Sequence, residues 1–266
     1  MTPLLRPLPL ATALLGSLLF SMTGLSAQAA PIKNLPADPD AVLSVGANIR
    51  YEKTPYNTDG GDFSVLPGLF YDNNKVYARG NTFGAYILND GTHQLDAFAQ
   101  IAGNSFDPED AEGALAGLDE RKWTGLAGLS YLQRTPIGGL RAQIATDIAG
   151  RSDGSVARLT YLAKFTDDKL TVYPSIGVEW NDSNYNEYYY GISDEEAART
   201  GLPSYSPGSS LSPYVSVSGM YDFTDKWAGF ASQTFDHLSS EQYDSPMVKP
   251  DNHFDSKTTL GLLYKF

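Results

Sequence analysis

The sequence contains no cysteine, so it can form neither a disulfide framework nor a thiolate metal site. Beyond the N-terminal region it also lacks any apolar run long enough for a membrane-spanning helix, and its mean hydropathy is −0.27. Basic residues are scarce, because 19 lysines and arginines stand against 31 aspartates and glutamates, a net charge of −12. Such a chain repels nucleic acid. If it enters a membrane, it must do so as a β-barrel.

The N-terminal region predicts a secretory signal. Arg6 is followed by an apolar run at residues 8–20 and by a small-residue A-x-A site at residues 27–29. We expect cleavage after residue 29 or one residue later. The signal carries only one charge, so its removal changes the net charge from −12 to −13 and leaves residues 30–266 as a single domain. An uncleaved anchor is disfavoured, because the run is shorter than the roughly 20 residues that a spanning helix needs.

The rest of the chain alternates apolar and polar residues in segments separated by turn residues, which is the pattern of transmembrane β-strands. Residues 42–51 and 140–149 show it, and so does the last segment, which ends at Phe266. This predicts an all-β fold, namely an antiparallel up-and-down transmembrane barrel. A soluble β-sandwich alternates equally well, but it does not need aromatic residues at both ends of its strands. Such residues are expected here at Trp123, Trp180 and Trp227.

The connections between the strands fall into two length classes. Tight turns lie at residues 71–74, 89–92, 135–138, 166–168 and 222–225, and long polar loops at residues 104–120, 182–209 and 236–254. Outer-membrane barrels keep short turns on the periplasmic side, so this difference orients the barrel. Counting back from Phe266 gives twelve strands with both termini in the periplasm, provided that residues 75–88 form two short strands. If they form one long bulged strand, residues 104–120 must lie inside or below the barrel.

The longest loop carries a helix signal. Ser193 and Glu196 form a capping box, in which each side chain bonds the backbone N–H of the other residue. Gly201 supplies a left-handed stop and Pro203 prevents continuation. We therefore expect a short extracellular helix at residues 194–200.

Two further loop features stand out. Asp107 and Pro108 predict a second helix start, with a brief helix over residues 111–118. Residues 185–190 contain four tyrosines, too many for a loop that is merely solvated. Such a run either packs into the barrel mouth as a plug or faces a partner. Packing is favoured, because exposed aromatic patches are costly without a partner.

Candidate chemistry is sparse. His237 and His253, two of the three histidines, flank the last long loop near acidic residues and could activate water or bind a metal. The composition of that loop is flexible, and its sequence shows no pattern of further residues that would orient the two histidines. A G-x-S-x-G motif and a phosphate-binding glycine loop are both absent. We therefore predict no enzyme, no catalytic residue, no cofactor and no metal.

Charged residues are predicted on the inward face of the barrel. The candidate lumen-lining residues are Arg50, Arg79, Arg141, Asp147, Arg158, Lys164 and Glu179. A hairpin at residues 150–155 predicts that Asp147 faces Arg158 across a strand pair, as in a self-neutralised lumen. Side chains fill small barrels and larger barrels leave a channel, so a narrow pore and a plugged interior both stay open.

At this point the sequence resembles a known family. The loop residues that carry the resemblance are Tyr188, Tyr189, Tyr190, Gly191, Ser193, Glu196, Gly201, Pro203 and Tyr205. Together they resemble the signature loop of the MipA/OmpV family, the MltA-interacting proteins. Residues 76–80, residues 115–118 with Arg121 after them, and the Gly-x-x-Tyr-x-Phe ending resemble other parts of that family. Leu118 stands where Met is expected, which conserves side-chain volume.

The resemblance implies a protein of the bacterial outer membrane. For the best-known member it implies a scaffold that brings a periplasmic lytic murein transglycosylase together with a bifunctional murein synthase. We therefore expect a non-enzymatic scaffold that contacts outer-membrane lipid and binds these enzymes through its short turns and residues 31–40. A narrow channel for small solutes, and a surface adhesin that uses the tyrosine-rich loop, are the alternatives.

Overall fold

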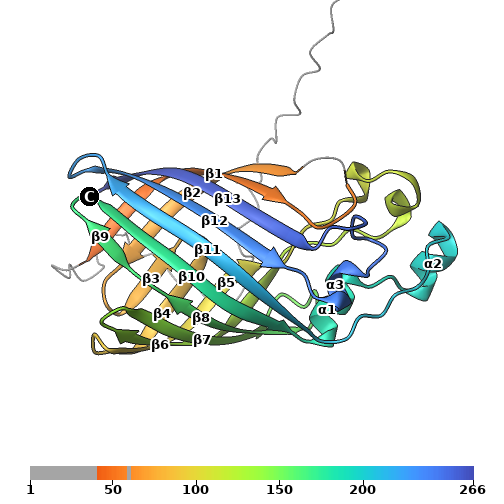
Figure 1. The fold of residues 1–266 in the computed structure, drawn as a ribbon, viewed down its shortest axis with the longest axis horizontal. Helices are drawn as coiled ribbons and strands as arrows, with labels where there is room; N and C mark the ends of the chain where they lie inside the picture. The colour runs from red at the N-terminus through yellow and green to blue at the C-terminus, as the bar shows by residue number, and fades with distance from the viewer. Residues whose placement is uncertain (1–40, 59–60) are drawn as a thin grey trace, which may run out of the picture. The chain divides into compact units, whose positions relative to one another are not determined.

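The computed structural model describes residues 41–58 and 61–266, which form a closed antiparallel β-barrel (Figure 1). Neighbouring strands pair in chain order, except that β8 and β9 both pair with β10, and the last strand, β13, pairs with β1 to complete the wall. The predicted fold class is confirmed. The signal predicted at residues 1–29 and the segment 31–40 lie outside the described residues.

The wall is built from thirteen strand segments. They are β1 Val42–Lys53, β2 Asp62–Asp72, β3 Val76–Arg79, β4 Thr82–Asn89, β5 His93–Ala102, β6 Thr124–Thr135, β7 Gly138–Asp147, β8 Ser155–Leu162, β9 Phe165–Asp167, β10 Leu170–Asn181, β11 Ser210–Asp222, β12 Trp227–His237 and β13 Phe254–Lys265. Both β8 and β9 pair with β10 and act as one wall strand, so the barrel has 12 strands, as predicted. The break between them lies beside Pro174, which lacks an N–H to donate.

Residues 75–88 form two strands, β3 and β4, which are joined by a tight turn. The strand count therefore holds, and residues 104–120 need not lie inside or below the barrel. All the long connections lie at one end of the wall, which we call the loop end. The opposite end carries Phe266 and the short turns other than the β3–β4 turn, and we call it the turn end.

Helices occur in the loops. They are α1 Ser183–Tyr190, α2 Asp194–Thr200, α3 Ser240–Tyr243 and the 3-10 helices η2 Pro108–Asp110 and η3 Gly113–Gly117. The predicted bounds of α2 are confirmed, and Asp107 caps η2 as expected. The helix predicted over residues 111–118 is wrong in extent, because Ala111 and Glu112 adopt extended backbone that separates η2 from η3. In the described part of the chain, no helix is long and apolar enough to cross a membrane.

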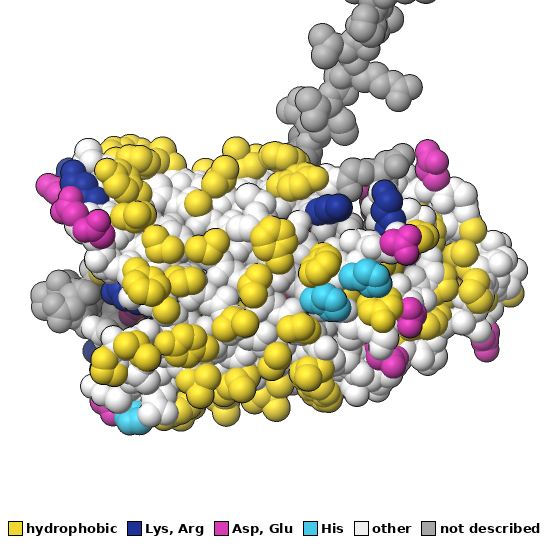
Figure 2. Space-filling model, viewed as in Figure 1, with side chains coloured by type: hydrophobic (Ala, Val, Ile, Leu, Met, Phe, Trp, Pro, Cys, Tyr) yellow, Lys and Arg dark blue, Asp and Glu magenta, His cyan; other side chains and the backbone are white. Residues whose placement is uncertain are grey.

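The outer surface of the wall is apolar. Along β1, Val45 and Ile49 are exposed, whereas Ser44 and Asn48 are buried. Figure 2 shows hydrophobic side chains over the whole visible wall, with charged side chains gathered toward its two ends. Apolar residues outside and polar residues inside are what a wall in lipid requires. The tryptophans lie at strand ends as predicted: Trp123 and Trp180 at the loop end, and Trp227 at the turn end.

Candidate functional site at the barrel mouth and in the lumen

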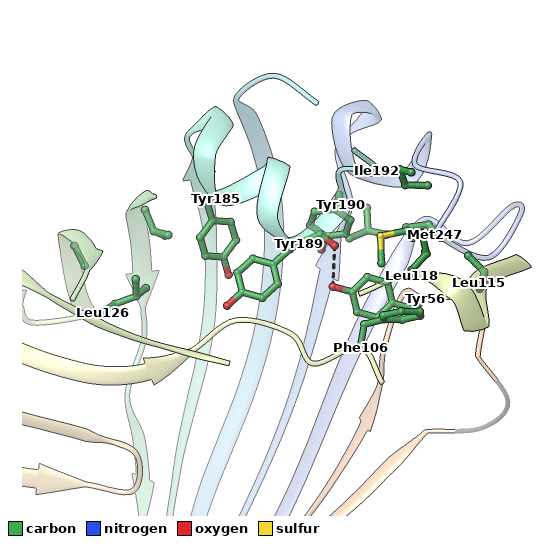
Figure 3. Close-up of a cluster of buried hydrophobic side chains, with 14 of the residues drawn as sticks. Tyr56, Phe106, Leu115, Leu118, Leu126, Tyr185, Tyr189, Tyr190, Ile192 and Met247 are labelled. Carbon is green, nitrogen blue, oxygen red and sulfur yellow. Dashed lines mark hydrogen bonds between the residues drawn. The ribbon is translucent and has the colours of Figure 1, made fainter. Parts of the chain in front are cut away.

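Buried side chains from four loops pack into one hydrophobic cluster at the loop end (Figure 3). We call it the mouth cluster; its main members are Tyr56, Phe106, Leu115, Leu118, Tyr185, Tyr189, Tyr190, Ile192 and Met247. The side chains of Tyr189 and Met247 are fully buried. The loops are therefore held by a core of their own, which continues onto inward residues of the strands such as Leu126.

Helix α1 delivers the tyrosines to this cluster. Asp182 caps the helix by accepting a hydrogen bond from the N–H of Tyr185 at 2.9 Å. Residues four apart lie on the same side of a helix, so Tyr185 and Tyr189 pack together, with ring centroids 4.7 Å apart. The tyrosine run thus packs into the barrel mouth. Sequence reasoning missed this helix, although the Asp182 cap signal was present.

The tyrosine hydroxyls have partners. Tyr56 donates to the carbonyl of Tyr189 at 3.0 Å, as Figure 3 shows, and Tyr189 donates to the carbonyl of Lys122 at 3.1 Å. Burial raises the pKa of Tyr56 well above its ordinary value, so this hydroxyl remains a neutral donor. Gly103 approaches the same cluster with a φ of +92°, and a Cβ there would lie 1.9 Å from the Tyr189 hydroxyl oxygen. The packing leaves no room for a larger residue.

A buried ion pair joins two of the loops. Nη2 of Arg121, which follows η3, lies 2.8 Å from one carboxylate oxygen of Glu196 in α2 and 3.1 Å from the other. The two side chains are only 8% and 4% exposed. Burial opposes the charge on Glu196, but hydrogen bonds from the N–H groups of Asp119 and Ser193 and from Arg121 outweigh it and lower its pKa to about 2.

The signature loop is closed at its base. Ile192 and Tyr205 exchange two backbone hydrogen bonds of 2.8 and 2.9 Å, so α2, Gly201 and Pro203 lie in a hairpin-like excursion between them. Gly201 ends α2 in the left-handed conformation, with φ of +77°. The Tyr205 hydroxyl donates to the carbonyl of Glu241 at 3.3 Å. This contact ties the excursion to α3.

Below the mouth cluster the barrel encloses a cavity of about 1180 Å³. It extends from Tyr185 and Tyr190 at the loop end to Thr135 and Gly138 at the turn end. Six of the seven candidate lumen residues line it: Arg50, Arg79, Arg141, Arg158, Lys164 and Glu179. The exception is Asp147.

The predicted pairing of Asp147 with Arg158 is wrong. In the β7–β8 register Arg158 lies opposite Gln143, and its guanidinium pairs with Glu179 on β10. The Asp147 carboxylate instead accepts hydrogen bonds from the Thr124 hydroxyl at 2.7 Å and from the backbone N–H of Ala149 at 2.8 Å. Because Asp147 organises the β7–β8 loop in this way, β7 ends at this residue and not at residue 149.

The lumen also contains charges that sequence reasoning left off the candidate set. Nζ of Lys257 lies 3.1 Å from a carboxylate oxygen of Glu52 and 3.6 Å from one of Asp255. Asp236 lies opposite Asp255 in the β12–β13 register. The alternation of polar residues along β12 and β13 could have identified this acidic group.

The histidines do not assemble a metal site in the part of the chain that the structure describes. The rings of His237 and His253 stack with their centroids 6.4 Å apart, and Tyr243 packs on His253. Among the described residues, no group of three or more histidine, cysteine, aspartate or glutamate side chains is arranged to hold a metal ion.

With this geometry in place, the comparisons identify the family. The family model described as "MltA-interacting protein MipA" matches residues 45–266. The chain belongs to this family. It is 37% identical over 231 residues to the MltA-interacting protein of Escherichia coli (strain K12), covering 86% of this chain and 92% of the relative.

Other relatives share the location. Outer membrane protein OmpV of Vibrio cholerae is 23% identical over 219 residues, covering 74% of this chain and 84% of that protein. The solved COG4313 outer membrane channel of Pseudomonas putida F1 aligns with a TM-score of 0.44 at 9% identity, over 85% of this chain and 96% of that one. The relatives named as outer membrane proteins, together with the closed wall and its apolar outer face, make this MipA-family chain an outer-membrane β-barrel, as predicted.

The MipA-family signature has a structural explanation in this chain. The segments that carry the resemblance are far apart in the sequence, yet the structure brings Arg121 and Glu196 into one ion pair. Leu115 and Leu118 pack in the same cluster as Ile192, next to that pair. The residues on which the sequence resemblance was based therefore hold the loop end together in this chain.

Proposed function

We propose that this protein is a non-enzymatic scaffold, which binds a periplasmic lytic murein transglycosylase and brings it together with a murein synthase. The observation that carries the proposal is the 37% identity, over nearly the whole of both chains, to a relative named for its interaction with MltA. The periplasmic side of such a barrel is its turn end, so the partners would bind there.

The turn end has the properties of a docking face. Its turns are held by local hydrogen bonds: the Asn73 side chain accepts from the N–H of Val76 at 2.8 Å, and Asp90 accepts from the N–H of His93 at 2.7 Å. Such preorganised turns lose little conformational entropy on binding. Ile137, at the tip of the β6–β7 turn, is 76% exposed and supplies an apolar anchor.

Co-purification from native membranes tests this proposal. The wild-type protein, solubilised in mild detergent, is expected to retain the transglycosylase and the synthase, and Ile137→Ser to retain less of both. Ile148→Ser is the matched control, because Ile148 is also an exposed isoleucine beside β7 but lies at the loop end. If the wild-type protein recovers neither enzyme at native abundance, the scaffold proposal fails.

A second candidate function, solute passage, is favoured by the charged cavity. The mouth cluster packs across the loop end above it, so passage along the barrel axis would require these loops to move. Planar-bilayer recording tests this: deletion of residues 184–205 is expected to raise conductance, and Arg141→Ala in that background to change its ion selectivity. Conductance that is absent from both proteins would refute it.

Adhesion is less well supported. Tyr185, Tyr189 and Tyr190 are buried in the mouth cluster, so the loop offers little aromatic surface to another cell.

A further inference from the structure

The barrel wall is shorter at strands β3 and β4 than at the strands on either side of them. Strand β3 contains 4 residues and β4 contains 8, whereas β2 contains 11 and β5 contains 10. On one edge β2 pairs with β1 along its whole length, but on the other it pairs with β3 only over residues 70–72. The last contact on the β3 side is a hydrogen bond from the N–H of Gly80 to the carbonyl of Leu69. From there toward the loop end, residues 62–68 of β2 have no strand neighbour on that side among the described residues.

This section is an opening with a complete frame. Its sides are the free edge of β2 and the upper end of β5, and its base is the tip of the β3–β4 hairpin at residues 80–81. Above it, the β1–β2 loop meets the β5–β6 loop, where Thr58 forms a β-bridge with Ala111. We call this frame the side opening.

The side opening lies within the apolar band of the wall. On β2, the outward-facing Phe63 and Val65 are 72% and 73% exposed, more than the outward apolar residues of the fully paired strand β1. On the opposite side, Ile101 of β5 lies opposite Gly125 of β6, just below the level of Trp123. Because Phe63 and Val65 are apolar and point outward, the β2 side of the opening faces lipid.

The internal cavity reaches the frame. Its lining includes Asn81 and Thr82 at the hairpin tip and Ile101 at the upper end of β5, as well as Arg50 on β1, which lies opposite Ser64 of β2. The lining continues from Ile101 to Asn104, so the cavity reaches the end of β5 and the start of the β5–β6 loop.

The backbone of β2 fits a free edge. Backbone groups of alternate residues point to the same side of an antiparallel strand, so Pro67 faces the opening together with Leu69, whose carbonyl bonds β3. Proline has no N–H to leave unpaired, and it is typical of edge strands. Free backbone groups at membrane depth are tolerated only where protein or a water-filled cavity satisfies them. The lumen supplies that cavity.

We propose that the side opening is a lateral passage between the outer leaflet and the lumen, and that it admits a single-chain amphiphile with an anionic head, such as a fatty acid. The acyl chain lies against Phe63 and Val65. The head group enters the lumen beside Arg50, whose guanidinium forms no ion pair or hydrogen bond with the described residues. Arg141 and Lys164 also line the cavity, but Arg50 lies on β1 directly across from Ser64 of β2, and the neighbouring Glu52 is already paired with Lys257. Arg50 is therefore the lumen cation on the strand next to the free edge.

Fluorescence quenching from the bilayer tests the passage. The chain has no cysteine, so single-cysteine variants can carry a bimane label at one chosen position. Thr82→Cys places the label at the frame, and Thr160→Cys is the matched control, because Thr160 also lines the cavity but belongs to the continuous wall at β8. Both proteins are folded into phosphatidylcholine vesicles that contain stearic acid with a nitroxide on its chain, and folding is checked by heat-modifiable gel migration.

The label at position 82 is expected to lose fluorescence to the nitroxide-bearing chain, and the label at position 160 to lose much less. Arg50→Gln is expected to reduce the quenching by stearic acid at position 82, but not the quenching by phosphatidylcholine that carries the same nitroxide. Equal quenching at positions 82 and 160 would overturn the passage, and quenching by stearic acid that does not depend on Arg50 would overturn the role of the anionic head. Neither result bears on the binding of murein enzymes.

Discussion

The two ends of this barrel are ordered by different kinds of contact. At the turn end, each turn is closed by hydrogen bonds between residues two or three positions apart, as between Asn73 and Val76, and exposed side chains such as Arg134 link neighbouring turns. At the loop end they join residues far apart in the chain: Tyr56 bonds Tyr189 and Arg121 bonds Glu196. The turns are therefore specified locally, whereas each long loop takes its conformation from the others. It follows that the loop end can be loosened by one substitution that leaves the wall intact.

The largest expected effect is at the loop-end ion pair. Arg121→Ala leaves the Glu196 carboxylate buried without its charge partner, and removing one member of a buried pair costs about 3–5 kcal/mol. Hydrogen exchange measured by mass spectrometry should show loss of protection across residues 183–205, while the strand peptides keep theirs.

A turn-end arginine provides the control for this change. Arg134 lies at the end of β6 and donates to the side chains of Asn89 and Gln94 and to the carbonyl of Gly91, none of which is charged, so Arg134→Ala should cost about 1 kcal/mol. If both substitutions loosen their ends equally, the contrast between long-range and local order is wrong.

Acid should act selectively on the loop end. The pKa of Glu196 is lowered in the folded state to about 2, so its stabilising contribution is fully present above its unfolded value, which is near 4.5, and is lost as the pH falls from there toward 2. Limited proteolysis of the folded protein with an acid-active protease should cut the 183–205 region progressively over this range. Glu196→Gln should be cut at neutral pH as well, with little further dependence on pH.

A smaller effect is expected from a single loop-end hydrogen bond. Tyr56→Phe removes the donor to the Tyr189 carbonyl but keeps the buried ring, so it should destabilise the mouth cluster by about 1 kcal/mol. Hydrogen exchange of the α1 peptide is the measurement. If α1 in Tyr56→Phe exchanges as fast as in Arg121→Ala, the stability of the mouth cluster depends mainly on this hydrogen bond and not on side-chain packing.

The smallest effect is expected at the turn end. The Thr224 hydroxyl accepts hydrogen bonds from the N–H groups of Lys226 and Trp227, but the site is exposed and water can replace it. Thr224→Ala should change the free energy of unfolding by no more than about 0.5 kcal/mol in urea titrations in lipid vesicles. A larger loss would show that the turns also depend on more than local contacts.

The same division explains what the sequence could predict. Alternation along the strands, the short turns and the capping box at Ser193 and Glu196 are local patterns, and they appear in the structure close to where they were expected. The turn predicted at residues 166–168 is displaced, because β9 extends to Asp167. Short turns and long loops must lie at opposite ends of the barrel, and this alternation required two strands between residues 75 and 88. The lengths of the connections are also visible in the sequence.

The predictions that failed, and the features that were missed, depend on partners that spacing does not reveal. Asp147 could have faced Arg158, but the backbone N–H groups of its own loop are closer and hold it. The residues of the capping box were visible, yet nothing along the chain showed that Glu196 also pairs with Arg121, 75 positions away. Alternation identifies inward residues, including Asp236 and Asp255, but their position opposite each other beside Lys257 follows only from the register of β12 and β13.

Closure of the wall has a consequence for the assembly of this protein. β1 pairs with β13, from Ser44 opposite Lys265 to Lys53 opposite Ser256, so the first strand to emerge during synthesis waits for the last. Until then both strands present unpaired edges that can join other chains. We therefore expect that loss of β13 yields aggregation-prone chains and not a smaller barrel. A delivery route that keeps the whole chain unfolded until its C-terminus is available would avoid that outcome.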